Sequence, residues 1–391
     1  MNKIHEAFAN TFLVVVTTLV TFAILEATAN IWLLHFADEK YFIRYASLQQ
    51  LQDSDISNHP RYSPHRYIGY YPTPNYVKGK DRHNALGYRG DEIDVPKPAG
   101  QFRIACLGGS TTYTSEVNDY RDSYPYLLEK YLKSKGYKDI TVVNAGAGSW
   151  SSWESLINFQ LRVLDLDPDL IIVYHGINDI SPRFVWPPEA YRGDNSGARA
   201  PNQTGIFMPG IFEYSTLLRI AMISTGLINS HASFETTIDR RPDTYYGTLF
   251  NKQKTSGIYP KGIFEEVGAV DILNTNKADY FERNIQSIVA IATSRGIEVV
   301  LSSFATSPLF TDQPKVSSDE YISAYAENNR LLKAIANDTN QHFFDFSAEF
   351  PTEKRWYTDG RHVNEDGARL KAELFGDFLI EAQLLPSHSS R

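Results

Sequence analysis

Four short polar segments contain residue types that together could cleave an ester. They are Gly108-Gly109-Ser110-Thr111, Gly146-Ala147-Gly148-Ser149, Gly176-Ile177-Asn178-Asp179 and Asp359-Gly360-Arg361-His362. The Ser110 hydroxyl is a weak nucleophile until a base takes its proton, and His362 can be that base because its reference pKa lies near neutrality. Asp359 comes one turn before His362, so its carboxylate can reach Nδ1, fix the tautomer and stabilise the imidazolium. We therefore predict Ser110, Asp359 and His362 as the catalytic residues.

Attack on an ester also creates an oxyanion, which needs fixed hydrogen-bond donors. The candidate donors are the Ser110 N–H, an N–H from the turn at Gly148 and Ser149, and the side-chain amide of Asn178. The spacing does not decide between Gly148 and Ser149, so both remain candidates. This mechanism requires neither a metal nor a cofactor, and no His, Asp or Glu cluster has metal-ligand spacing.

Regular elements must bring these distant segments together. Short apolar runs predict strands at Arg103–Leu107, Ile140–Val143, Leu170–Tyr174, Glu298–Phe304 and His342–Phe346. Helical spacing predicts helices at Tyr124–Lys135, from about Ser151 onward, and at Lys277–Arg295, Asp319–Thr339 and Glu365–Ala382. The alternation indicates a five-stranded parallel sheet covered on both faces, which is a three-layer α/β/α, flavodoxin-like fold. Such sheets bind ligands beyond the carboxyl ends of their strands, where the first three polar segments fall.

The polar segments also carry a family resemblance. The blocks GGST, NAGAGS, GIND and DGRH resemble those of SGNH/GDSL hydrolases and occur in that family's order. The similarity covers roughly Phe102 to Leu385 and is interrupted by an insertion at about 180–276. It implies a serine esterase or acylhydrolase of the membrane-anchored GGST-type subgroup. The positions that match the family's nucleophile, oxyanion amide, acid and base are Ser110, Asn178, Asp359 and His362.

This sequence departs from the family pattern at two places. Gly109 stands where the commonest motif has Asp, and Ser149 occupies the position best aligned with the family's oxyanion glycine. A backbone donor tolerates the second change. The segment from Asn84 to Gly90 also resembles a stretch that precedes the catalytic domain in membrane-linked relatives. Its residue types alone do not indicate what this segment does.

The N-terminus contains an apolar stretch long enough to cross a membrane. Residues 7–25 carry no charge, and as a helix they would span about 28 Å. Lys3 precedes them, so we expect a cytoplasmic N-terminus and an extracytoplasmic catalytic domain. A signal peptide cleaved at Ala27-Thr28-Ala29, which would release a secreted protein, is the first alternative. A buried core helix is the second.

These features predict three regions. They are an anchor or signal segment at 1–37, an irregular extension at 38–100, and a hydrolase domain at 101–391 whose loop-rich insertion, about 180–276, holds one helix near 215–228. The net charge of −8 argues against a nucleic-acid partner.

The function expected is removal of acyl groups, with acetyl as one candidate, from an extracytoplasmic glycan or lipid. An acyltransferase that passes the acyl group to a polysaccharide hydroxyl would need the same residues. A non-catalytic binding or assembly module that kept the fold is a third hypothesis, and a His362 side chain far from Ser110 would favour it. The sequence leaves the substrate and the oligomeric state open.

Overall fold

The computed structural model describes residues 2–47, 49–50, 61–65, 67–193, 210–228, 230 and 245–386. The chain forms two compact units, one made of Met1–Pro60 and Pro201–Arg240, the other of Arg61–Ala200 and Arg241–Arg391. Residues 61–100, which we expected to form a separate extension, thus belong to the same unit as the sheet. Residues 194–209, 229 and 231–244 of the expected insertion lie outside the described residues.

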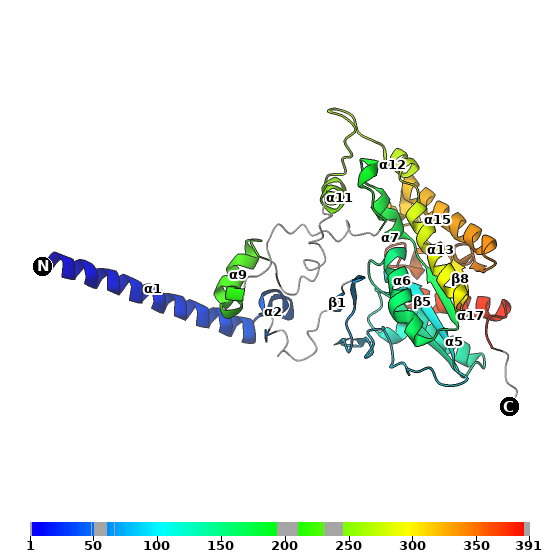
Figure 1. The fold of residues 1–391 in the computed structure, drawn as a ribbon, viewed down its shortest axis with the longest axis horizontal. Coiled ribbons are helices and arrows are strands. Elements are labelled where there is room, and N and C mark those ends of the chain that lie inside the picture. Colours follow the sequence, from blue (N-terminus) through cyan, green and yellow to red (C-terminus); the bar gives the residue numbers. More distant parts are fainter. Residues whose placement is uncertain are drawn as a thin grey trace. The chain divides into compact units, whose positions relative to one another are not determined.

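The larger unit is built on a parallel sheet of five strands in the order β6-β5-β7-β8-β9. Figure 1 labels β5 and β8 of this sheet. The strands are β5 (Phe102–Gly108), β6 (Ile140–Gly146), β7 (Leu170–Tyr174), β8 (Glu298–Ser302) and β9 (His342–Phe344). The predicted flavodoxin-like α/β fold is confirmed. Gly108 pairs with Gly146 on one side and with Tyr174 on the other, so β5, β6 and β7 end at one level. The loops after these strands therefore start side by side, at the point where the strand order reverses.

Helices cover both faces of this sheet, which explains why the strands are almost continuously apolar. The side chains of Ile104 and Cys106 pack in one core with α5 (Tyr124–Ser134) and α17 (Glu365–Glu381). Those of Ala105 and Leu107 face the opposite core, built with α6, α13 and α15. These last helices span Ser152–Asn158, Asp279–Ser294 and Asp319–Asp338. All the helices predicted around the sheet are present, with ends within a few residues of the expected positions.

Two regions contain more regular structure than their sequences indicated. The segment 61–100 forms two antiparallel hairpins, β1 (Tyr62–His65) with β2 (Gly69–Pro72) and β3 (Val77–Lys78) with β4 (Asp81–Arg82). These strands are too short to show a clear alternation. The segment 180–276 contains, besides the expected helix α9 (Thr216–Ser224), helices α11 (Tyr245–Ser256) and α12 (Ala269–Thr275). The remaining short helices are α4 (Ser110–Tyr113), η2 (Tyr120–Asp122), η3 (Phe159–Val163), η4 (Leu164–Leu166), α7 (Ile177–Ile180), η5 (Ser181–Arg183), η6 (Pro188–Ala190), η7 (Gly210–Tyr214), α14 (Pro314–Ser317), α16 (Phe346–Glu349) and η8 (Lys354–Trp356).

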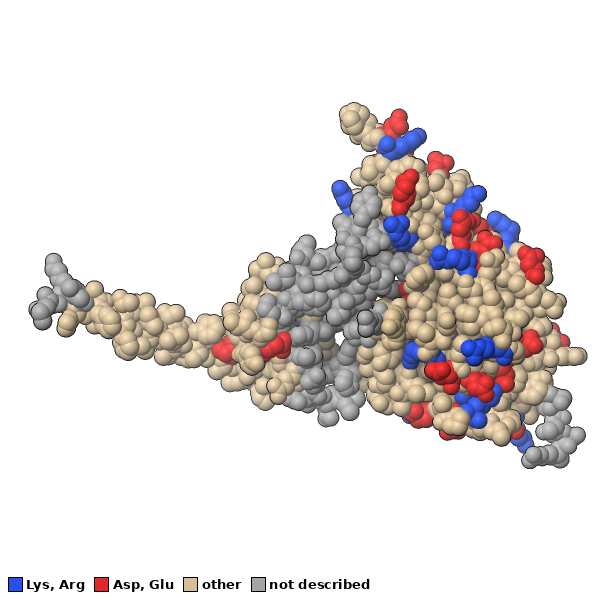
Figure 2. Space-filling model, viewed as in Figure 1, with Lys and Arg blue, Asp and Glu red and all other residues tan. Residues whose placement is uncertain are grey.

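The smaller unit consists of a long apolar helix and the elements packed near its C-terminal end. Helix α1 (Asn2–His35) contains a candidate membrane span, His5–His35, in which an 18-residue window has a mean hydropathy of 2.1 and no buried residue. Figure 2 shows its surface almost free of charged side chains. Leu33 packs with Tyr45 of α2 (Glu39–Tyr45) and with Ile223 of α9. The length and composition of α1 suit a membrane anchor or a signal sequence.

Candidate active site

The structure brings the three predicted catalytic side chains into one hydrogen-bonded chain. Ser110 lies at the first position of α4, directly after β5, and its Oγ lies 2.7 Å from Nε2 of His362. The Nδ1 atom of the same ring lies 3.0 Å from Oδ2 of Asp359. A carboxylate can only accept, so in the neutral ring Nδ1 carries the proton and Nε2 accepts from the Ser110 hydroxyl. This is the protonation state that a general base requires. The separation of Ser110 and His362 that would have favoured a non-catalytic module is not found.

The Asp359 carboxylate is held by its own turn. Its Oδ1 accepts the backbone N–H groups of Arg361 (3.1 Å) and His362 (2.9 Å), and its Oδ2 also pairs with the Arg361 guanidinium at 2.8 Å. Burial opposes the charged form, yet the hydrogen bonds and charge of His362, and then the charge of Arg361, hold the pKa of Asp359 well below its ordinary value. Asp359 is therefore ionised at neutral pH. Arg361, for which the sequence indicated no role, contributes to this.

Asn178 lies beside the nucleophile turn. Its side-chain Nδ2 donates to the Trp150 carbonyl at 2.9 Å, which ties the loop after β7 to the loop after β6. Gly109 lies against both groups, because a Cβ atom placed on it would meet the Trp150 carbonyl oxygen at 2.7 Å and the Asn178 Nδ2 at 2.8 Å. The Asn178 amide thus adjoins the residue before Ser110, as an oxyanion donor must.

The turn after β6 contains Gly148 and Ser149, the two residues whose backbone N–H could serve the oxyanion hole. The Gly148 N–H donates to the Tyr62 hydroxyl at 2.9 Å, and the Gly148 carbonyl accepts from the Tyr70 hydroxyl. Ser149 adopts a left-handed conformation with φ of 61°. In this structure the Gly148 N–H therefore already donates to a side chain, which disfavours Gly148 as the backbone donor of the oxyanion hole.

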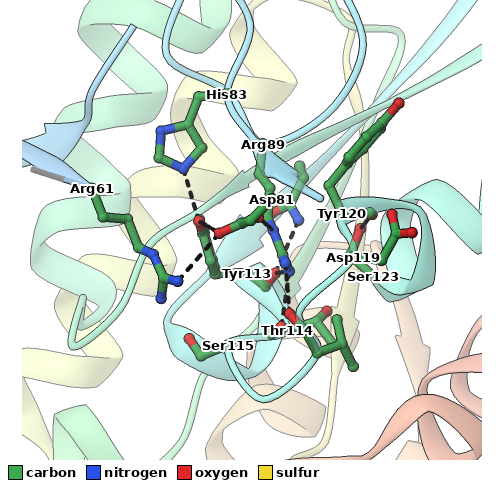
Figure 3. Close-up of polar contacts among 12 residues, drawn as sticks. Arg61, Asp81, His83, Arg89, Tyr113, Thr114, Ser115, Asp119, Tyr120 and Ser123 are labelled. Atoms are coloured by element: carbon green, nitrogen blue, oxygen red, sulfur yellow. Dashed lines mark hydrogen bonds and ion pairs between the residues drawn. The ribbon is translucent and has the colours of Figure 1, made fainter. Parts of the chain in front are cut away.

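A buried polar cluster supports the far end of the nucleophile helix (Figure 3). The Arg89 guanidinium donates to the carbonyls of Tyr113 (2.8 Å), Thr114 (2.9 Å) and Val117 (2.7 Å), which follow or end α4. Its Nε donates to Asp81 at 2.7 Å, and both side chains are almost fully buried. A single guanidinium thus satisfies carbonyls that the short helix leaves without partners. This supplies a physical role for the Asn84–Gly90 segment.

The Tyr113 hydroxyl joins the same cluster. It lies 2.7 Å from Nε2 of His83, whose Nδ1 lies 2.9 Å from the Thr73 carbonyl. Burial lowers the pKa of His83 to about 4, so the ring is neutral at pH 7. Because the carbonyl can only accept, Nδ1 carries the ring proton and Nε2 accepts from Tyr113. His83 is thus a structural histidine.

A buried lysine contacts the nucleophile helix from the other side. Lys371 of α17 is 1% exposed, and its Nζ lies 3.3 Å from the Thr111 carbonyl and 3.5 Å from the centre of the Tyr174 ring. Burial lowers the pKa of Lys371 well below its ordinary value. Neither Lys371 nor Arg89 could be identified from the sequence, since each is a lone basic residue in an ordinary context. Among the residues that the structure describes, no group of His, Cys, Asp and Glu side chains is arranged to hold a metal ion.

Asp179 and His175 stabilise the start of α6. The Asp179 carboxylate accepts from the Ser152 hydroxyl at 2.6 Å and the Ser152 N–H at 2.9 Å, and His175 lies 2.9 Å from the Ser155 hydroxyl. Burial raises the pKa of Asp179 to about 7, against the opposing effect of the Ser152 hydrogen bonds. Burial also lowers the pKa of His175 to about 3. Both side chains therefore have structural partners and lie outside the hydrogen-bonded chain of Ser110.

Comparison with known proteins agrees with this geometry. A sequence model of the GDSL-like Lipase/Acylhydrolase family matches residues 106–226, a range that includes Ser110 and Asn178 but ends before Asp359. A search of curated proteins finds no match.

Several solved structures have a similar fold at low sequence identity. A GDSL-like lipase from Bacteroides thetaiotaomicron is 14% identical, with a TM-score of 0.39 over 74% of this chain and 93% of that one. A lipase/acylhydrolase from Enterococcus faecalis is 11% identical, with a TM-score of 0.41 over 72% and 97%. An acetyl-xylooligosaccharide esterase variant from Geobacillus Stearmophilus is 13% identical, with a TM-score of 0.40 over 71% and 94%.

The family match falls on the segment that runs from β5 through the loops after β6 and β7, which is where the polar segments converge. The chain thus contains a segment, residues 106–226, that is similar to the GDSL-like Lipase/Acylhydrolase family.

Proposed function

We propose that this protein is a serine esterase that removes ester-linked acyl groups through an acyl-enzyme on Ser110. The observation that carries the proposal is the continuous hydrogen-bonded chain from the Ser110 hydroxyl through His362 to Asp359, with contacts of 2.7 Å and 3.0 Å. Few arrangements of these three residue types have another use.

The reaction follows from the roles of these groups. His362 Nε2 takes the hydroxyl proton as the Ser110 Oγ attacks the ester carbonyl carbon, and the ionised Asp359 stabilises the imidazolium that forms. The tetrahedral intermediate collapses as His362 gives its proton to the leaving alcohol, and Ser110 keeps the acyl group. Water, deprotonated by His362, then attacks the acyl-enzyme; His362 returns the proton to the Ser110 Oγ as its bond to the acyl carbon breaks, which releases the acid and restores the free serine.

The oxyanion of both intermediates needs donors beside Ser110. We assign this role to the N–H groups of Ser110 and Ser149 and to the side-chain amide of Asn178. The hydrogen bond between Gly148 and Tyr62 supports the choice of Ser149. The contact of Asn178 with the Trp150 carbonyl supports the third donor, because this amide already lies against Gly109. Each donor of this kind contributes about 3–4 kcal/mol to transition-state stabilisation.

We further propose that α1 is an uncleaved membrane anchor, with its N-terminus in the cytoplasm and the catalytic domain outside. Glu26 of α1 accepts the N–H groups of Thr216 (2.6 Å) and Leu217 (3.1 Å), and the Ser215 hydroxyl at 2.7 Å. These are the unpaired donors at the start of α9. Cleavage after Ala29 would remove Glu26 and leave these donors without their acceptor, so the packing of α9 favours an intact helix.

This location suggests the substrate class. An enzyme held at the outer surface of a membrane meets acylated glycans and lipids, and acetyl esters are the simplest of these. Mass spectrometry of the mature protein tests the anchor directly, since a chain that starts at Asn30 would refute it.

Hydrolysis of p-nitrophenyl acetate and labelling by a fluorophosphonate test the esterase assignment. The full-length protein in detergent should hydrolyse the ester and be labelled on Ser110. The Ser110→Ala variant should lose both properties, and Ser134→Ala, which removes an exposed hydroxyl on α5, should keep both. Equal activity in Ser110→Ala and wild type would refute the assignment. Product analysis with a glycan acceptor present would reveal transfer in place of hydrolysis.

A further inference from the structure

Two tyrosine hydroxyls from the N-terminal hairpin hold both polar groups of Gly148. Tyr62 of β1 accepts the Gly148 N–H, and Tyr70 of β2 donates to the Gly148 carbonyl oxygen. The two rings pack edge to face, with centroids 5.3 Å apart, and Tyr70 is 3% exposed. The hydroxyl approaches closely because residue 148 is glycine: a Cβ atom there would meet the Tyr62 hydroxyl at 2.8 Å, and Tyr62 would have to shift.

This contact determines the direction of the neighbouring N–H. The Gly148 carbonyl and the Ser149 N–H belong to one planar trans peptide, so they point in opposite directions. A hydrogen bond that fixes the carbonyl therefore also fixes the N–H. The turn lies beside the nucleophile segment, because the Ala147 N–H donates to the Gly108 carbonyl at 3.2 Å and the Trp150 carbonyl adjoins Gly109.

The conformation of Ser149 makes such a restraint necessary. Its φ of 61° lies in the left-handed region, which costs a residue with a side chain about 1–2 kcal/mol. Rotation of the peptide between Gly148 and Ser149 changes this φ and would relieve the strain. It would also turn the Ser149 N–H away from its present direction. The strained form persists only where the surroundings hold it.

We infer that Tyr70, supported by Tyr62, is a positioning residue for the oxyanion hole, which it serves by holding the peptide between Gly148 and Ser149 in its catalytic orientation. The inference depends on the proposed esterase function. It assigns to the N-terminal hairpin a part in catalysis, although the hairpin supplies no reacting group. The Tyr70 hydroxyl acts through the Ser149 N–H and does not touch the substrate.

The test removes single hydroxyl groups in the full-length protein. Tyr70→Phe should lower kcat for p-nitrophenyl acetate about 10- to 100-fold, somewhat less than complete loss of one oxyanion donor. The KM and the apparent pKa of the rate profile should stay unchanged, because neither substrate contacts nor the His362 base are altered. Tyr71→Phe is the matched control, since Tyr71 lies on the same strand and packs against His65 and Arg162. Its kcat should equal that of wild type.

A second variant separates positioning from a general loss of folding. Glycine adopts a left-handed conformation without strain, and Ser149→Gly keeps the backbone donor. The double variant Tyr70→Phe/Ser149→Gly should therefore regain at least tenfold in kcat over Tyr70→Phe. No recovery, or a Tyr70→Phe kcat within twofold of wild type, would overturn the inference.

The esterase function and the role of Tyr70 are refuted by different results. If wild type neither hydrolyses the ester nor is labelled at Ser110, the esterase function itself is wrong. If wild type is active and labelled while Tyr70→Phe matches it, only the role of Tyr70 is wrong.

Discussion

Replacing Gly109 by alanine should displace the Asn178 amide, the proposed oxyanion donor, and leave the side chains of Ser110, His362 and Asp359 in place. The φ of Gly109 is −90°, outside the left-handed region, and the effect considered is that of the added methyl group. That Cβ would lie 2.7 Å from the Trp150 carbonyl oxygen and 2.8 Å from the Asn178 Nδ2, whereas ordinary contacts begin at 3.4 Å. Relief requires a movement of about 0.6 Å or more. The Asn178 amide can rotate away once its hydrogen bond to the Trp150 carbonyl breaks, whereas the contact with that carbonyl is relieved only by a shift of backbone, so the amide and the turn should both move.

The expected cost is that of one oxyanion donor, about 3–4 kcal/mol, or a fall in kcat of about 100- to 1,000-fold. The assay is steady-state hydrolysis of p-nitrophenyl acetate, with KM and thermal unfolding measured in parallel. Gly262→Ala is the control, since the nearest atom to its added Cβ would be 3.9 Å away. A Gly109→Ala enzyme with wild-type kcat would refute this account of Asn178. The same contact explains why residue 109 carries no side chain in this protein.

Two further predictions concern the buried cations next to the nucleophile helix. Arg89→Lys should destabilise the protein by about 3 kcal/mol in urea unfolding, because one ammonium cannot replace four buried hydrogen bonds, one of them to Asp81. Arg82→Lys, whose ion pair with Asp91 is exposed, should cost under about 1 kcal/mol; equal costs would contradict the role given to Arg89. Lys371→Met should raise stability near neutral pH, because burial lowers the pKa of Lys371 in the folded protein, whereas the unfolded chain binds this proton up to about pH 10. The advantage should shrink as the pH rises towards 10 in thermal unfolding scans, and a difference that is constant with pH would show that titration of Lys371 is not its cause.

The elements of the sheet could be predicted because their signals are local. Each strand is a short apolar run, and each covering helix has an apolar face with recognisable ends. Asn364 illustrates this, since its side chain accepts the Gly367 N–H at the predicted start of α17. Three of the four polar segments directly follow predicted strands, and parallel strands present their carboxyl ends at the same end of the sheet. This predicted that Ser110 lies beside the other polar segments.

The residues that hold the loops of the candidate site in place could not be predicted, because their role depends on contacts between residues far apart in the sequence. Tyr62 and Tyr70 lie in a region with no periodic pattern, and only folding brings their hydroxyls to Gly148. The pairing of Glu26 with the start of α9 is likewise a tertiary contact. A hydrogen bond of this kind needs two particular atoms within about 3 Å, and spacing along the chain carries no information on that distance.

The sequence by itself determined the fold class, the residue types of the active site and the order in which they occur, because these depend on local hydrophobic periodicity and on strand ends. The tertiary structure alone decided which backbone donor of the Gly148–Ser149 turn is already occupied, that Gly109 must lack a side chain, and that the N-terminal hairpin packs against the catalytic loops. These features depend on close approach in three dimensions, where a few tenths of an ångström separate a hydrogen bond from a clash.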